Sequence, residues 1–85
     1  MNRDKLTNMS VREAAVGTMQ VLVSLQDEQP EKVVAAAAAF FLHACARFGI
    51  PANDAIFITT NIINGADGKR PEFKAVEQFM AEEWS

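Results

Sequence analysis

The spacing of apolar residues divides the chain into four helical segments preceded by a polar stretch. Apolar positions recur every three or four residues over 11–27, 30–48, 51–64 and 71–84, which is the period of an α-helix. Pro30 and Pro71 suit first helical positions, and Gly49 and Gly65 suit the positions after a last turn. We predict an all-α protein, a small four-helix orthogonal or bundle-like domain. Residues 1–9 are predicted to be a flexible N-terminal segment, and residues 10–85 a single helical domain.

Residues 55–63 also permit a different assignment. They are rich in β-branched side chains, which favour strands. Their alternation is poor, however, helix signals bracket them, and the chain offers no second good strand to pair with them. A helix is the prediction, and a strand stays the alternative.

The second helix, residues 30–48, is apolar on nearly every side. Its polar residues form one stripe made of Lys32, His43 and Arg47, and small alanines fill much of the remainder. A helix that is apolar all round is usually buried among its neighbours. We therefore predict that the second helix is central, with its polar stripe as a weaker candidate for partner contacts.

The first helix carries two apolar stripes. The main stripe is predicted to enter the core and comprises Val11, Ala14, Ala15, Thr18, Val21, Leu22 and Leu25. A second stripe is formed by Val16, Met19 and Val23. Either the last helix covers this second stripe, or it is a contact surface for another subunit or partner.

The third and fourth helices each present an apolar face. The third is predicted to bury Ala55, Ile56, Ile58, Ile62 and Ile63. Phe57 falls among polar residues on the opposite side, so it is a candidate contact residue. On the fourth helix Phe73, Val76, Met80 and Trp84 align, with Phe79 at the edge. Trp84 is interpreted as a core anchor, with a binding hot spot as the alternative.

Length and composition favour one domain that gains from association. A chain of 85 residues buries only about 60–65% of its unfolded surface, although 49% of these residues are hydrophobic. Self-association, as a symmetric homodimer, would bury more. The net charge of −3 opposes nucleic-acid binding, which usually requires a basic surplus. The longest apolar run has ten residues, half of what a membrane helix needs, and no secretory signal is recognisable, so a cytoplasmic protein is expected.

Residues able to carry chemistry are few and poorly placed for it. His43 and Cys45 are the only histidine and cysteine, and at helical spacing their side chains point apart. No metal-ligand spacing and no phosphate-binding loop is present. We therefore expect neither enzyme activity, nor a metal, nor a cofactor. A small-molecule carrier or enzyme stays an alternative that would need an enclosed pocket.

Residues 45–58 partly match a helix-turn-helix. A small residue, Cys45, precedes the turn residue Gly49 by four positions, and the aliphatic Ile50 follows it. The would-be recognition helix has no Lys or Arg, and its one charge, Asp54, would repel phosphate. Our prediction is thus a small, acidic, non-enzymatic protein that self-associates or docks on a larger protein to modulate it. A DNA-binding module using this degenerate motif is the alternative.

Overall fold

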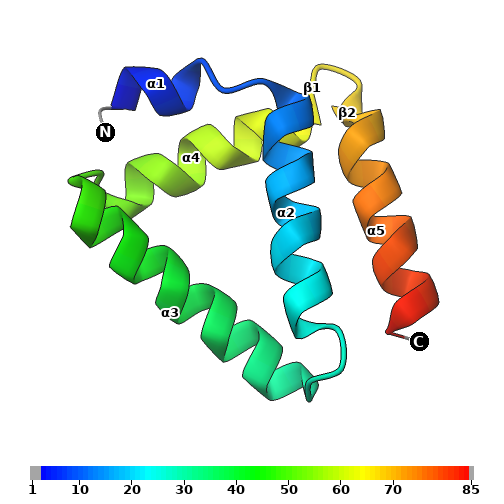
Figure 1. The fold of residues 1–85 in the computed structure, drawn as a ribbon. Helices are drawn as coiled ribbons and strands as arrows, with labels where there is room; N and C mark the ends of the chain where they lie inside the picture. The colour runs from blue at the N-terminus through cyan, green and yellow to red at the C-terminus, as the bar shows by residue number, and fades with distance from the viewer. Residues whose placement is uncertain (1–2, 85) are drawn as a thin grey trace.

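The computed structural model describes residues 3–84 as five helices and one short hairpin (Figure 1). The elements are α1 (Arg3–Thr7), α2 (Val11–Leu25), α3 (Pro30–Phe48), α4 (Ala52–Ile63), β1 (Asn64–Gly65), β2 (Gly68–Lys69) and α5 (Pro71–Glu83). The all-α class is confirmed, and the four predicted helices end within two residues of their expected limits. Residues 55–63 lie within α4, so the prediction of a helix for that segment is confirmed.

Local capping explains where the helices begin and end. The Ser10 hydroxyl accepts a hydrogen bond from the backbone N–H of Glu13 at 3.0 Å, which satisfies one of the free donors at the start of α2. Pro30 and Pro71 open α3 and α5, where a missing N–H costs nothing. Between α4 and α5, Asn64 pairs with Lys69 and Gly65 with Gly68 in an antiparallel two-residue ladder, so the expected turn is a small hairpin.

A glycine corner turns the chain by 113° between α3 and α4. Gly49 adopts a left-handed conformation (φ 74°, ψ 30°), and its N–H donates to the carbonyl oxygen of Cys45. The N–H of Ile50 donates to the same oxygen at 3.0 Å, and Ile50 packs beside Cys45. The closure combines the 6→1 bond of a Schellman motif with the 5→1 bond of an αL cap, and both need a residue that tolerates positive φ.

Alanine at Gly49 and at Gly17 should have opposite effects on stability. A Cβ at either position meets nothing within 4 Å, so only backbone conformation matters. Gly49→Ala is expected to destabilise the fold by about 1–2 kcal/mol, because alanine disfavours the left-handed region. Gly17→Ala, inside α2, is expected to stabilise it by about 0.5–1 kcal/mol. Urea denaturation monitored by circular dichroism measures both, and a loss of stability at Gly17 equal to that at Gly49 would contradict the assignment.

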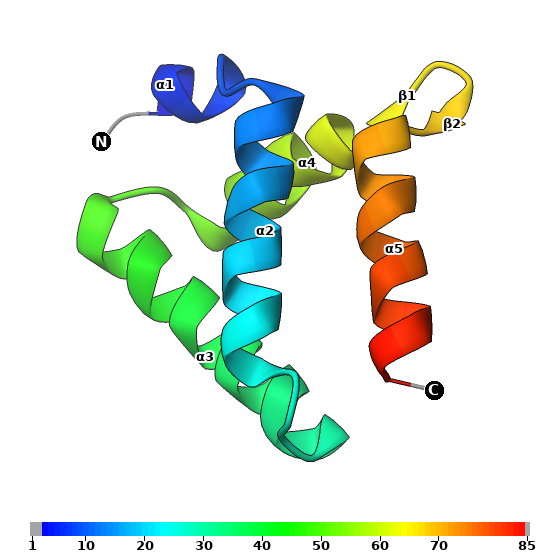
Figure 2. The same cartoon turned by 45° about the vertical axis from the view of Figure 1, so that its right-hand side comes forward.

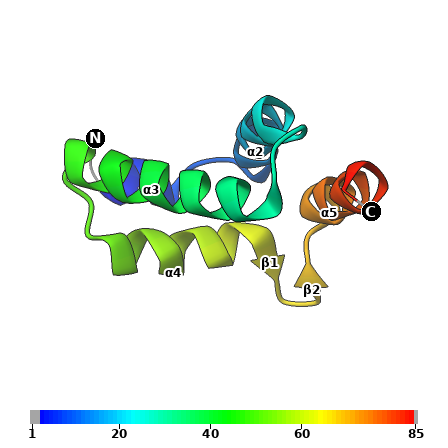
Figure 3. The same ribbon diagram turned by 90° about the horizontal axis from the view of Figure 1, so that it is seen from below.

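The helices form a thin, open arrangement with two apolar clusters. In Figure 1, α2, α3 and α4 outline a triangle and α5 lies beside α2; in Figure 2, α2 and α5 again run side by side in the same direction. The main cluster joins α2, α4 and α5 through Ala15, Leu22, Ile58, Ile62, Phe73 and Val76. A smaller cluster of Cys45, Ile50 and Ala55 fills the corner between α3 and α4. The molecule measures 36 × 30 × 17 Å, and Figure 3 shows its flat profile.

The predicted central position of the second helix is not confirmed. Of all α3 residues only Cys45 is buried, while Val34 is 69% and Phe40 66% exposed. The reason is geometric: α3 packs on α4 near the corner, and Figure 1 shows it diverging from α2 along one side of the triangle. The apolar faces of α3 are real, but few of this chain's residues cover them.

Two other expectations differ from the structure. Ile56, predicted to be buried, is 53% exposed, because the buried face of α4 is centred on Ala55, Ile58 and Ile62. Within the predicted flexible segment, residues 3–7 form α1, and Leu6 packs against both apolar clusters. The flexibility of that segment stays a prediction, and residues 1–2 of it, like residue 85 of the domain, lie outside the described residues.

Candidate interaction surfaces

The second stripe of the first helix lines an open groove between α2 and α5. The groove has a volume of about 740 Å³ and contains Val16, Met19 and Val23 on one wall and Ala75, Val76 and Phe79 on the other. The α5 helix thus borders the stripe and covers it only in part: Val16 is 50% and Val23 54% exposed. Cover by the last helix is therefore partial, and a contact between the open part of the stripe and another subunit or partner stays a prediction.

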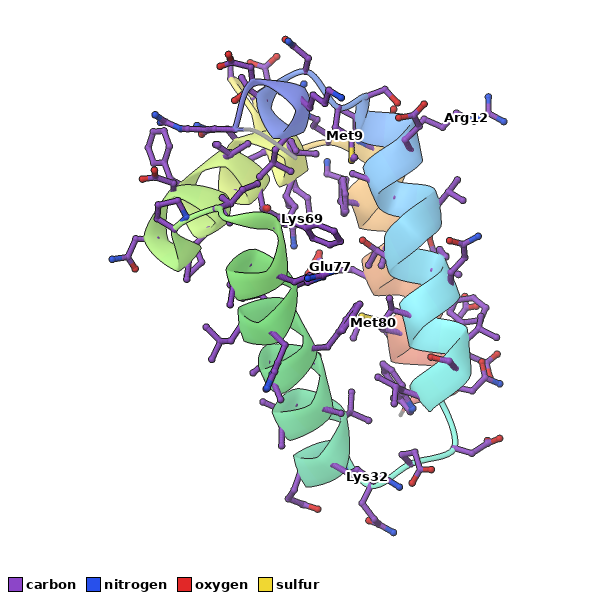
Figure 4. The ribbon with its side chains drawn as sticks, turned by 60° about the vertical axis from the view of Figure 1, so that its left-hand side comes forward. Met9, Arg12, Lys32, Lys69, Glu77 and Met80 are labelled. Atoms are coloured by element: carbon purple, nitrogen blue, oxygen red, sulfur yellow. The ribbon has the colours of Figure 1, made fainter. Side chains whose placement is uncertain are left out.

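A second apolar recess lies where α5 approaches the start of α3. It is lined by Val33, Val34, Met80 and Trp84, and Figure 4 shows Met80 in the space between α3 and α2. The Trp84 indole N–H donates to the carbonyl oxygen of Gln26 at 2.5 Å, and Trp84 also packs against the main cluster. Trp84 therefore anchors the end of α5 to the end of α2, as its interpretation as a core anchor requires.

Phe57 sits at a smaller recess together with residues from the N-terminal segment. It is 63% exposed, and the recess also contains Arg3, Met9 and Arg70. Arg3 lies 3.9 Å from the carboxylate of Asp54, and an Arg70 guanidinium nitrogen donates to the carbonyl oxygen of Asn61 at 3.2 Å. Two cations that are distant in sequence therefore border the polar face of α4, which by itself has none.

The polar stripe of α3 is exposed and partly neutralised. Lys32 forms an ion pair with Glu28 at 3.1 Å, one turn earlier. The His43 ring nitrogen Nδ1 is 2.7 Å from the carbonyl oxygen of Ala39, within its own helix. Arg47 is exposed near the corner. These three residues lie on one side of α3, and none of them lines the groove or the two recesses described above.

The groups able to carry chemistry are dispersed. Cys45 is buried in the corner cluster, whereas His43 points to solvent from the other side of α3. Among residues 3–84, no group of three His, Cys, Asp or Glu side chains is placed to hold a metal ion. In the same part of the chain, no single helix combines the length and the apolar character needed to cross a membrane.

Several exposed apolar residues were missed as surface residues by sequence reasoning. The sequence pattern places Val34, Phe40, Leu42 and Phe48 on a central helix, yet all four are exposed. Ile56 and Val21, predicted to enter the core, are exposed as well. The apolar pattern is the same for a residue that another helix of the chain covers and for one that stays exposed, so the sequence does not distinguish the two.

Comparison of the chain with protein-family models, with curated protein sequences and with solved structures gave no match.

Proposed function

We propose that this chain is a small, non-enzymatic, cytoplasmic interaction protein. It acts by burying exposed apolar helix surface against another protein surface, either a copy of itself or a larger protein whose activity it modulates.

The observation that carries this proposal is an excess of exposed surface. The chain exposes 6284 Å², whereas a folded monomer of 9.3 kDa is expected to expose about 5,000 Å². Its radius of gyration is 13.3 Å, compared with about 12 Å for a compact chain of this length. A standard protein interface removes about 800 Å² from each partner, so one such interface accounts for most of the excess.

The chemistry of the excess surface fits a protein partner. Eleven large apolar side chains of the described residues are exposed, and they are Met9, Val16, Val21, Val23, Val34, Phe40, Leu42, Phe48, Ile56, Phe57 and Met80. Only nine hydrophobic residues of the described part of the chain are buried. Val16 and Val23 together line the groove between α2 and α5, and apolar surface gathered in one place is typical of interaction sites.

Photo-crosslinking in living cells of the protein's own host tests this function. A photoreactive phenylalanine analogue replaces Val23, Phe40 or Phe57 in turn, and Lys74, which is exposed on α5, serves as the polar control. We expect a defined crosslinked species from at least one apolar position and none from Lys74. If every position gives uncrosslinked chain, and the purified parent is monomeric, the proposal is wrong.

DNA binding stays a second candidate because of the corner geometry. The 113° bend and the three-residue turn lie within the range of helix-turn-helix units, and Arg3 and Arg70 border the polar face of α4. Affinity for duplex DNA that falls steeply with salt would support it. Fluorescence anisotropy at low ionic strength is the measurement, and the absence of any salt-dependent change would remove this candidate.

A further inference from the structure

We propose that the groove between α2 and α5 receives the α2 helix of a second copy of this chain, in an antiparallel and twofold-symmetric arrangement. This inference rests on the proposed function and specifies its partner. In such a pair each α2 fills the other copy's groove, so the two α2 helices and the two α5 helices form a four-helix bundle.

The groove has the lining that the apolar face of a helix needs. Its walls are almost entirely apolar along α2 and α5, and Arg12 and Glu72 lie among its lining residues at the N-terminal ends of these helices. Figures 1 and 2 show α2 and α5 side by side, and the groove runs between them. Because the molecule is only 17 Å thick, a second layer of helices would convert this open face into an interior.

The exposed positions of α2 are self-complementary in the antiparallel direction. An axis between Met19 and Gln20 relates Val16 of one copy to Val23 of the other, and Val23 to Val16. In the single chain Val16 is 50% and Val23 is 54% exposed. In the pair, each valine would cover the exposed surface of the other. Side chains three and four residues apart share one helix face, so the same register brings this whole stripe into contact.

The same axis relates Arg12 of one copy to Asp27 of the other. Arg12 starts the stripe and points away from the molecule in Figure 4, and Asp27 follows Val23 by four residues, just beyond α2. Both are exposed, and no ion pair of either is found within residues 3–84. Antiparallel pairing thus forms two Arg12–Asp27 contacts, one at each end of the α2 pair. It also aligns the helix dipoles favourably.

A parallel pair lacks these advantages. It would bring Arg12 against Arg12 and Asp27 against Asp27, and like charges at an interface oppose association. The charge pattern therefore selects a second copy in one orientation, and it is the feature that distinguishes this face from the equally apolar surface of α3.

Matched valine substitutions on α2 and α3 locate the interface. Mass by light scattering over a dilution series is measured for the parent, Val16→Glu, Val23→Glu and the control Val34→Glu, which changes a valine of α3 that is 69% exposed. We expect the parent to be a dimer. The dissociation constants of the two α2 variants are expected to be about 100-fold higher, because each variant adds two unpaired charges to the interface. The dissociation constant of Val34→Glu is expected to equal that of the parent. Circular dichroism confirms that each variant is folded.

Charge exchange tests the orientation. Arg12→Asp and Asp27→Arg each create two like-charge contacts, so each is expected to weaken the dimer about 10-fold. An equimolar mixture of these two variants restores both contacts between unlike chains. The double variant restores them, with the charges exchanged, between two identical chains. Both are expected to regain the parent's affinity. A merely structural role for either residue predicts no recovery on mixing.

Four results would overturn the inference. The first is a strictly monomeric parent, and the second is loss of the dimer in Val34→Glu but not in Val16→Glu. The third is no recovery in the mixture, and the fourth is a crosslinked protein other than this chain on Val23. The second, third and fourth of these results leave the proposed function intact. The proposed function fails only if the parent is monomeric and the crosslinking experiment yields no crosslinked species.

Discussion

Phe73→Ala is expected to destabilise the protein by about 3–5 kcal/mol, enough to unfold a substantial fraction of it at 25 °C. Phe73 is buried in the first turn of α5, where it joins the cluster shared by α2 and α4. Removing the ring leaves a cavity among residues that cannot all move inward. A domain of 85 residues has a total stability of only about 4–13 kcal/mol, so this single change is a large part of it.

Phe40→Ala is the matched control for this substitution. Phe40 is 66% exposed on α3, so its truncation creates no internal cavity, and we expect a change of less than about 1 kcal/mol. Urea denaturation at one fixed protein concentration compares the two, since association would shift the apparent stability. Similar losses for both variants would mean that α3 is covered in solution and that the main cluster is not the dominant core.

Ile58→Ala is expected to cost about 2–5 kcal/mol, whereas Ile56→Ala, on the same helix, is expected to cost less than about 0.5 kcal/mol. Ile58 is buried between α4 and its neighbours in the main cluster, while Ile56 is exposed. The two residues have the same size and the same helical context, so their difference isolates the effect of burial.

Urea denaturation monitored by circular dichroism measures this second pair. The slope of denaturant unfolding should stay the same for both variants, because neither changes the surface exposed on unfolding by much. Equal destabilisation would show that α4 is rotated relative to the described arrangement and that Ile56 is buried as the hydrophobic pattern suggested.

Only the α2 wall of the groove between α2 and α5 was predictable from the sequence. Val16, Met19 and Val23 share a face at helical spacing, and the sequence analysis identified them as a stripe outside the main core face. The opposite wall of the groove comes from α5, through Val76 and Phe79, and its position follows from tertiary packing. The relation between Arg12 and Asp27 needed both the observed end of α2 and the knowledge that neither residue is paired within the chain.

The α3 helix shows what the hydrophobic pattern of a helix does not determine. An apolar face indicates that a helix gains free energy from cover, but the pattern is the same whether the cover is another helix of the chain or another molecule. Ile56 is a second example. It lies next to the buried face of α4, and its residue type is the same as that of Ile58 and Ile62, which lie on that face.

The sequence by itself determined the helical class, the limits of the four long helices and the corner at Gly49, because capping residues, prolines and glycine act through local backbone geometry and hydrogen bonds. Only the tertiary structure decided which apolar faces meet. Those contacts depend on the angles between helices, which arise from the simultaneous packing of residues far apart in the chain, such as Leu22, Ile58 and Phe73.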